Sequence, residues 1–406
     1  DDINSKLDFN YYPIESHQLQ FGANFIFHTF TPTNVAVKTD ELNSLDFKKK
    51  IRLYSYDGAA YILDNYDLSD KIGINIGLRY SFFQHIGPFN RFVKNETGLI
   101  TDTIKYKSGE NVQLYQRLEP RVTFRYTLTS SSSIKAAFSQ NYQYIHLVSY
   151  ATVSLPSDVW VPSTEIVKPQ LSTQYALGYF RNVWDNKYET SVESYYKAMK
   201  NLIEYKDGYA PEDDLLDNPD NNFVFGDGNA YGAELFVKKR TGKTTGWIGY
   251  TLSWTTRDFP DINFGKQFYA KYDRRHDISL LIFHKLNKKW EFSGVFVFAS
   301  GNTTTLPVAR YTIEGKILNE YGLRNSYRMA AYHRLDLSAT FTPVQKKKRK
   351  YESSWNFGVY NAYNRNNPYF IYFDETNFYK TGIFETKAKQ VSLFPILPSI
   401  SWSFKF

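Results

Sequence analysis

The sequence of 406 residues contains no cysteine, only two methionines and no long apolar run. Without cysteine, neither a disulfide framework nor a thiolate metal site can form. No stretch approaches the roughly 20 consecutive apolar residues that a membrane-spanning helix needs, so transmembrane helices are excluded. The two methionines also fit badly with a large soluble protein, whose cores use Leu, Ile, Val, Ala and Met.

Aromatic residues are abundant instead, with 34 Tyr, 32 Phe and 7 Trp among the 406 positions. Disordered chains are poor in aromatic residues, so disorder is excluded. The net charge of +8 is mild for this length and does not by itself indicate nucleic-acid binding. The composition therefore favours a β-rich protein in which one face of many strands is aromatic.

Apolar and polar residues alternate with a period of two along most of the chain. From residue 72 to 82, Ile, Leu, Tyr and Phe occupy the even positions, and Gly, Asn, Arg and Ser occupy the odd ones. This period indicates strands with one apolar and one polar face. The pattern predicts about fifteen strands, near residues 3–13, 18–30, 51–65, 71–86, 114–127, 133–147, 171–182, 187–204, 229–241, 244–257, 272–286, 288–300, 332–343, 351–363 and 391–406.

The connections between these strands alternate in length. Tight turns follow the odd-numbered strands, and long polar loops follow the even-numbered ones. All short turns then lie at one end of the strands, as in transmembrane β-barrels with short periplasmic turns and long extracellular loops. In lipid every backbone group must be paired, which a closed antiparallel barrel achieves. We therefore predict an all-β, antiparallel outer-membrane barrel of a Gram-negative bacterium, in contact with lipid and lipopolysaccharide.

An odd number of strands is unexpected, because bacterial barrels normally have an even number. Either residues 368–374 (PYFIYFD) add a strand, or the chain is the carboxyl-terminal part of a larger barrel. Plugged transporters have about 22 strands, so about 15 of a probable 22 would be present. We expect residues 1–406 to form one partial barrel domain, with the plug and the first strands outside this chain. No signal peptide is visible at Asp1, so either a mature chain starts there or upstream sequence is missing.

Several segments also match one protein family in the family's order. They are LEPR (Leu118–Arg121), LPSDVWVPS (Leu155–Ser163), KPQ (Lys168–Gln170), YGAELFVKK (Tyr231–Lys239), TGWIGYTLSW (Thr245–Trp254), YDRRHD (Tyr272–Asp277), ASGNTTTLP (Ala299–Pro307) and QVSLFPILPSISWSFKF (Gln390–Phe406). Together they resemble the carboxyl-terminal barrel of TonB-dependent outer-membrane receptors. The resemblance is to the branch that often carries a carboxypeptidase-regulatory-like domain. The last strand differs from that of the SusC-type glycan importers.

The resemblance implies a receptor that binds a ligand at extracellular loops and imports it through a plugged barrel, driven by TonB. A SusD-like lipoprotein lid is less expected, although other outer-membrane or lipoprotein partners stay possible. The alternative is a non-transporting accessory or scaffold barrel within a larger outer-membrane complex. An open diffusion porin is a third and weaker alternative, because the resemblance is to a plugged family.

Two segments are candidates for ligand binding at the barrel mouth. In LPSDVWVPS, Asp158 and Trp160 lie between two prolines, where the ring could stack on a ligand or pack into the lumen to close it. In YDRRHD, Tyr272, Arg274 and Arg275 could contact a ligand. The charged residues of YDRRHD could instead pair among themselves and anchor the loop, and the sequence favours this second interpretation.

Charged residues also occur at the polar positions of the predicted strands, where they would line the lumen. We expect them to hydrogen-bond to a plug domain, in this protein or in a separate one, more than to contact a ligand. They are Arg79, Glu119, Arg121, Arg125, Glu189 and Glu193.

No catalytic or metal-binding signature is present. The seven histidines lack an HExxH or paired spacing, and GxGxxG, GxSxG and P-loop motifs are absent. The basic run KKKRK (Lys346–Lys350) resembles a nucleic-acid patch, but on this topology it lies in a short periplasmic turn. We therefore expect no enzyme activity, no cofactor, no metal site and no nucleic-acid partner.

Overall fold

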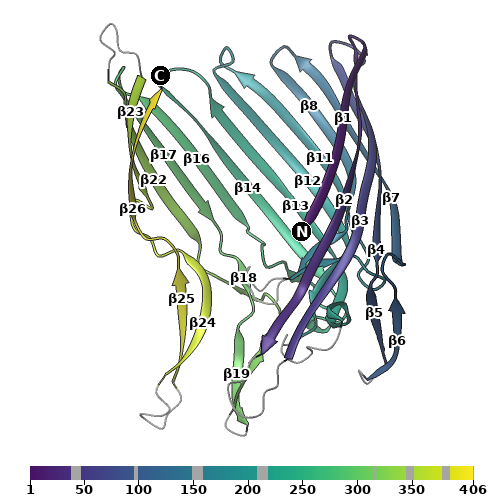
Figure 1. Cartoon of the computed structure of the whole chain (residues 1–406). Helices are drawn as coiled ribbons and strands as arrows, with labels where there is room; N and C mark the ends of the chain where they lie inside the picture. Colours follow the sequence, from purple (N-terminus) through teal and green to yellow (C-terminus); the bar gives the residue numbers. More distant parts are fainter. Residues whose placement is uncertain are drawn as a thin grey trace.

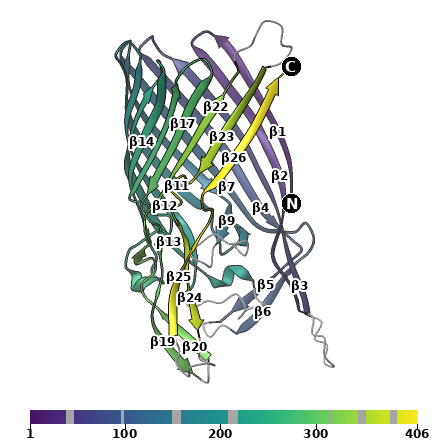
Figure 2. The same cartoon turned by 90° about the vertical axis from the view of Figure 1, so that its left-hand side faces the viewer.

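The computed structural model describes residues 1–37, 47–95, 99–148, 159–207, 218–313, 316–343, 352–376 and 385–405. Fifteen strands, each hydrogen-bonded to the next in antiparallel order, form one strongly curved sheet, here called the wall (Figures 1 and 2). The wall strands are β1 (Asp2–Ile14), β2 (His17–Val37), β3 (Phe47–Asp67), β4 (Ile72–Ile86), β7 (Asn111–Thr129), β8 (Ser132–Gln143), β11 (Gln170–Val183), β12 (Tyr188–Tyr205), β13 (Phe223–Lys239), β14 (Thr244–Asp258), β16 (His276–Lys285), β17 (Trp290–Ala299), β22 (Tyr332–Phe341), β23 (Glu352–Tyr360) and β26 (Leu397–Lys405).

Each of the fifteen predicted strands overlaps one wall strand, which confirms the all-β antiparallel prediction. The proposal that residues 368–374 add a wall strand is wrong. They belong to β24 (Pro368–Thr376), whose one strand partner among the described residues is β25 (Glu385–Ser392), in a hairpin that stands away from the wall (Figure 1). The alternation in this segment thus reports a two-stranded loop hairpin, because period two is common to any half-buried strand.

The wall does not close on itself. Among the described residues no pairing joins β1 to β26, so each has one edge without a neighbouring strand. Every residue of β1 is exposed, and so is every residue of β26. An unpaired edge cannot exist in hydrocarbon, because its N–H and C=O groups would lack partners there.

The cross-strand register assigns each side chain to one face of the wall. Arg79 lies opposite Glu119, whereas its neighbours Leu78 and Tyr80 lie opposite Pro120 and Leu118. The apolar set is largely exposed on the outer, convex face, for example Ile76 at 55% and Leu177 at 55%. A wide band of exposed aliphatic and aromatic side chains is the surface that acyl chains cover in an outer-membrane barrel.

Short turns and long loops are segregated at opposite ends of the wall, as predicted (Figure 1). The long loops fold into small elements of their own. They are β5 (Phe89–Lys94), β6 (Ile100–Tyr106), β9 (Ile145–Val148), β10 (Val159–Pro162), η2 (Pro219–Asn222), η3 (Asn263–Gly265), β15 (Phe268–Tyr269), β18 (Thr303–Thr304), β19 (Pro307–Ile313), β20 (Lys316–Tyr321), β21 (Tyr327–Arg328), β24 and β25.

The described residues contain no helix with the length and apolar character needed to cross a membrane.

The buried apolar clusters lie at the loop end of the wall and not along its middle. One contains Val148, Val161 and Val167 with the ends of β12 and β13, and another contains Phe259 and Ile262. A third joins Phe83 and Tyr115 of the wall to Tyr144, which lies between β8 and β9. Dry packing is therefore found where loops fold over the wall, and this end positions the candidate site.

Candidate functional site

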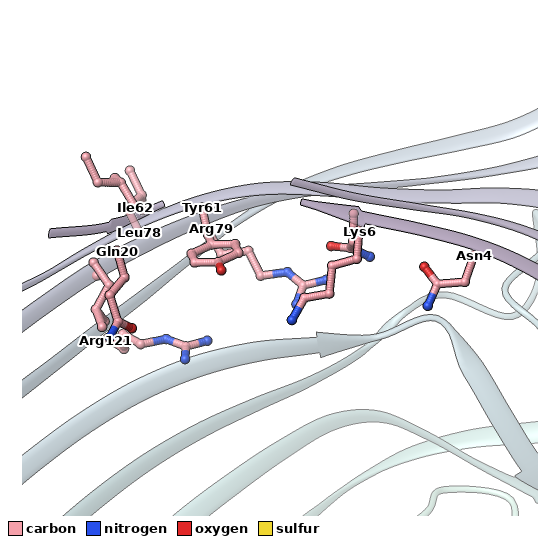
Figure 3. A pocket seen from close by; sticks show the side chains of 11 residues that line it. Asn4, Lys6, Gln20, Tyr61, Ile62, Leu78, Arg79 and Arg121 are labelled. Atoms are coloured by element: carbon pink, nitrogen blue, oxygen red, sulfur yellow. The ribbon is translucent and has the colours of Figure 1, made fainter. Parts of the chain in front are cut away.

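The predicted lumen residues of β4 and β7 share the inner face of the wall. Across these strands Arg79 lies opposite Glu119, Gly77 opposite Arg121, and Gly73 opposite Arg125. Figure 3 shows Arg79 and Arg121 on the side of the strands opposite to Ile62. These side chains therefore share one face of the sheet, and both their place in a lumen and their contact with a plug stay predictions.

Glu119 is the most deeply buried of these groups, with 4% exposure. Ser81 donates a hydrogen bond to its carboxylate, and the Ser81 hydroxyl also lies 2.8 Å from the hydroxyl of Tyr144. Nε of Arg79 lies 3.9 Å from the carboxylate, which is an ion pair without a hydrogen bond. This carboxylate is thereby held by the wall and by the loop that folds over it.

Arg125 and Glu189 are paired near the short-turn end. Arg125 donates to Asp67 at 2.8 Å, and Glu189 lies 3.0 Å from Arg240 and 3.5 Å from Lys238. These pairs are partly exposed, and pairs of this kind contribute about 0–1 kcal/mol each. Each of these charges therefore has an ionic partner within the wall.

Glu193 lies in a different setting. It is directly opposite Glu234 of β13, and the same register row continues through Thr251 to Asp277 of β16. None of these three carboxylates forms an ion pair with any residue that the structure describes. Like charges directly opposite each other on a sheet are destabilising. The row is therefore an acidic strip on the inner face, of which the sequence analysis identified only Glu193.

The YDRRHD segment is not the start of a strand, which corrects the predicted boundary at 272. The strand β16 begins at His276. The carboxylate of Asp273, which is 1% exposed, accepts a hydrogen bond from the backbone N–H of Thr255 at 2.7 Å, so it occupies the place of a ladder partner. The chain can pair regularly with β14 only after this point.

Asp273 anchors the mouth, in agreement with the favoured interpretation of this segment. Its carboxylate pairs with Arg275 at 3.5 Å and with Arg328, whose side chain also donates to the carbonyl of Gly301 at 2.8 Å. Arg275 in addition lies 4.5 Å above the ring of Trp254, a cation–π contact. Arg328 could not be identified from the sequence, because 55 residues separate it from Asp273.

The side chains of Tyr272 and Arg274, in the same segment, are exposed to solvent. Tyr272 is 59% exposed, and Arg274 is exposed and donates to the side chain of Asn302 at 2.9 Å. Of the three predicted contacts in this segment, these two side chains are accessible, whereas Arg275 is held by Asp273 and Trp254. The ligand-binding role of all three stays a prediction.

Trp160 lies on β10, opposite Leu147 of β9. Its side chain is 55% exposed, while the adjacent Val161 is 2% exposed and belongs to the buried cluster. The ring is therefore accessible in this structure, while its role in ligand stacking or in closing the lumen stays a prediction. Asp158 and the basic run 346–350 lie outside the described residues.

A buried ion pair joins two loops that are distant in sequence. Arg91 of β5 donates to both carboxylate oxygens of Asp220 in η2, at 2.9 and 2.8 Å, and the two residues are 6% and 4% exposed. Thr164 donates to the same carboxylate at 2.7 Å, and Asn218 accepts from the N–H of Phe92 at 2.8 Å. We call the interlocked elements β5, β6, β9, β10 and η2 the loop layer.

His146 lies within the loop layer at 1% exposure. Its Nε2 is 3.0 Å from the hydroxyl of Ser163, and its Nδ1 has no hydrogen-bond partner among the described residues. Burial lowers the pKa of His146 to about 4, because the charged ring would lose its hydration. No sequence signal identified this layer, since its contacts join residues as far as 129 positions apart.

The chain is similar to solved receptor structures over nearly its whole length. It aligns with the pyoverdine outer-membrane receptor FpvA from Pseudomonas aeruginosa PAO1 at a TM-score of 0.61 and 15% identity, covering 99% of this chain and 52% of that one. It aligns with the ferric-catecholate import receptor Fiu from Escherichia coli K12 at a TM-score of 0.59 and 13% identity, covering 99% and 54%. For the FrpB iron transporter from Neisseria meningitidis (F5-1 variant) the TM-score is 0.59 and the identity 12%, covering 100% and 56%.

These similarities establish a shared fold, and the chain spans about half the length of each of these structures. A comparison with curated proteins finds no match. A protein-family model described as TonB dependent receptor-like, beta-barrel, matches residues 1–362. With the fifteen-stranded wall, this match shows that the chain belongs to the TonB-dependent receptor β-barrel family, outer-membrane receptors and transporters of Gram-negative bacteria that are not enzymes.

Proposed function

We propose that this chain forms most of the barrel of a ligand-gated importer. In this proposal a ligand binds at the extracellular loops, a plug domain occupies the lumen, and TonB displaces the plug so that the ligand passes through the barrel. The further strands needed to pair the edges of β1 and β26, to a total of about 22, would come from the same protein. The outer face would contact lipid and lipopolysaccharide.

The observation that carries the proposal is the unpaired charge on the inner face. Glu193, Glu234 and Asp277 form a strip of carboxylates in one register row without a cationic partner among the described residues. Such a strip favours an occupant of the lumen that brings cations, because opposite charge offsets the repulsion across the strands. A plug domain that carries basic side chains at this height would provide them.

The loop end supplies the accessible groups for ligand contact. Trp160, Tyr272 and Arg274 are exposed, and together they offer two aromatic faces and one guanidinium. Aromatic rings stack on planar ligands, and a guanidinium binds oxyanions in a bidentate manner. We propose these three as the ligand contacts, with Asp273 and Arg275 holding the mouth in shape.

The test is energy-dependent uptake by cells that express the full-length receptor. The similar structures include receptors for pyoverdine and for ferric catecholates, so ⁵⁵Fe supplied as each of these two complexes is the first probe. We expect accumulation of at least one probe that stops when a protonophore collapses the proton-motive force. The W160A variant should lower binding of that probe to the purified receptor, with Trp184, an exposed ring on a short turn, as the matched control W184A.

Two outcomes would contradict the proposal. Uptake that continues unchanged with the protonophore would indicate passive diffusion. Absence of uptake and of binding for a broad ligand panel, together with stable co-purification of other envelope proteins, would support the alternative of an accessory or scaffold barrel.

A further inference from the structure

An open pocket of about 360 Å³ lies against the inner face of β1, β2, β3, β4 and β7. Its polar lining comes from five strands, and Figure 3 shows Lys6, Arg79 and Arg121 projecting from the wall into the same space. The residues around it are Asn4, Lys6, Gln20, Asn24, Tyr61, Ile62, Leu63, Gly77, Leu78, Arg79 and Arg121. Among the residues that the structure describes, the lining thus contains three cations, three amides and one phenol, and no carboxylate.

The three cations differ in how well they are neutralised. Nζ of Lys6 lies 2.8 Å from the carboxylate of Asp8, outside the pocket lining. Nε of Arg79 is 3.9 Å from Glu119 and makes no hydrogen bond, although this atom is buried. Arg121 forms no ion pair with any described residue. Two guanidinium groups on adjacent strands therefore face one pocket with unused donor capacity.

The backbone makes room for this arrangement. Gly77 lies directly opposite Arg121, and a Cβ atom at Gly77 would come within 2.9 Å of Cγ of Arg121. A side chain at this position would push the guanidinium away from the wall. The glycine therefore allows the Arg121 stem to lie flat against β4.

We propose that this pocket binds an oxyanion of the carboxylate or phosphate type between Arg79 and Arg121, with Lys6 and the amides of Gln20 and Asn24 as further donors. A planar guanidinium offers paired N–H groups that match the oxygens of such a group, and charge-assisted hydrogen bonds of this kind are the strong ones. The volume accommodates a small anionic group with part of the molecule that carries it. The absence of any carboxylate from the lining would disfavour a cationic occupant.

The proposal rests on the proposed importer function only for the source of the anion. Two sources are possible. The anion can belong to a solute that passes along the wall, or it can be a carboxylate of the plug. The site itself is a property of the wall and can be measured without transport.

The experiment measures the reactivity of individual arginines in the full-length receptor, purified in detergent and HEPES buffer. Phenylglyoxal modifies free guanidinium groups, and mass spectrometry of peptides gives the rate for each arginine. Arg181, an exposed arginine outside the pocket, is the internal reference. If the source is a solute, Arg121 should react about as fast as Arg181, and about 10 mM inorganic phosphate should slow it roughly fivefold or more without affecting Arg181.

If the source is the plug, Arg121 should be several times slower than Arg181 before any addition. In that case the R121K variant, treated with a carbodiimide, should form an amide cross-link to a carboxylate of the plug. Either result supports the anion site and identifies its source.

Two results would overturn the proposal. One is an Arg121 that reacts as fast as Arg181 and is not protected by phosphate. The other is an Arg121 that is slow from the start while R121K gives no cross-link, since the guanidinium would then be covered without an anionic partner.

Two matched variants separate a loss of anion binding from a loss of folding. R79Q should weaken the protection of Arg121 severalfold, whereas R125Q should leave it unchanged, because Arg125 is paired with Asp67 outside the pocket. The shift in gel mobility between heated and unheated samples confirms that each variant retains its barrel.

Discussion

The loop layer and the inner face of the wall both contain charged residues. In the loop layer these residues are buried and paired, whereas on the inner face several are exposed and unpaired among the described residues. In the loop layer, Arg91 and Asp220 are almost fully buried and make two direct hydrogen bonds with each other. On the wall, Arg121 and Glu234 are exposed and have no ionic partner among the described residues. An arginine and a carboxylate thus join two loops in one region, and remain free to bind another group in the other.

The difference follows from access to water. Burial of an unpaired charge costs several kcal/mol, so a dry loop cluster keeps an ion only with its partner in place. On an inner face that is open to water, an unpaired charge costs little free energy, because water of high dielectric constant solvates and screens it. Unpaired charge can therefore persist on the wall, where it is free to bind an incoming group.

The largest expected effect on stability comes from breaking the buried Arg91–Asp220 ion pair of the loop layer. Replacement D220A leaves the Arg91 guanidinium buried without its carboxylate and removes the acceptor of Thr164. Breaking a buried pair in this way costs about 3–5 kcal/mol. Hydrogen exchange of the amides in Phe89–Lys94 should accelerate accordingly, while the wall amides of β12 keep their protection.

The matched control is E291A, which removes the carboxylate that lies 3.8 Å from Lys285 in a more exposed pair. It should change stability by no more than about 1 kcal/mol. Equal effects of D220A and E291A would show that burial does not distinguish the two regions.

An intermediate effect is expected from the titration of His146. The pKa of the folded state is about 4, below the value of about 6.5 expected in the unfolded chain, so the neutral ring favours the folded loop layer. The contribution of the neutral His146 ring to the stability of the loop layer is fully present above pH 6.5. It is lost as the pH falls from about 6.5 to about 4, at about 1.4 kcal/mol per pH unit. Below pH 4 no further loss arises from this residue.

The measurement is hydrogen exchange of the β9–β10 amides between pH 7 and pH 4, corrected for intrinsic exchange. The H146N variant should show a pH slope lower by about one proton in this window, whereas H276N, at an exposed histidine, should keep the original slope. An unchanged slope in H146N would assign the pH dependence to other groups.

The smallest expected effect is on the acidic strip. In the full-length receptor, E234Q should cost about 0.2–1 kcal/mol, because it removes one partner of the cations that we place in the lumen, and high salt should abolish the difference. Thermal unfolding at low and at high salt provides the measurement. T251S, a neutral change in the same row, is the control, and a gain in stability for E234Q would argue that no cation is docked there.

Much of the fold could be predicted from the sequence because it depends on local periodicity. The alternation around Ile76 and Leu78 defines the outer face, and it places Arg79, Glu119 and Arg121 on the inner one. The short turns and long loops have unmistakable lengths, so the ends of the wall could be assigned as well. The sequence could not decide whether the segment 368–374 adds a wall strand, because a loop hairpin and a wall strand share the same period.

The candidate site was less predictable, because its decisive contacts join distant residues. Arg274 and Arg275 are adjacent in sequence, yet one is exposed and the other is held against Trp254. The sequence marks Glu193 as a single polar position, and only the register between strands places Glu234 and Asp277 in the same row. The partner of Arg91 follows 129 residues later, and no local pattern marks Asp220 as that partner.

The sequence by itself determined the strand pattern, the outer apolar face and the family, because period-two alternation, loop lengths and short motifs are properties of neighbouring residues. Only the tertiary structure decided which charges are paired, buried or free. Pairing depends on the register between strands and on the folding of loops over the wall, and both arise from contacts between residues that are far apart in the chain.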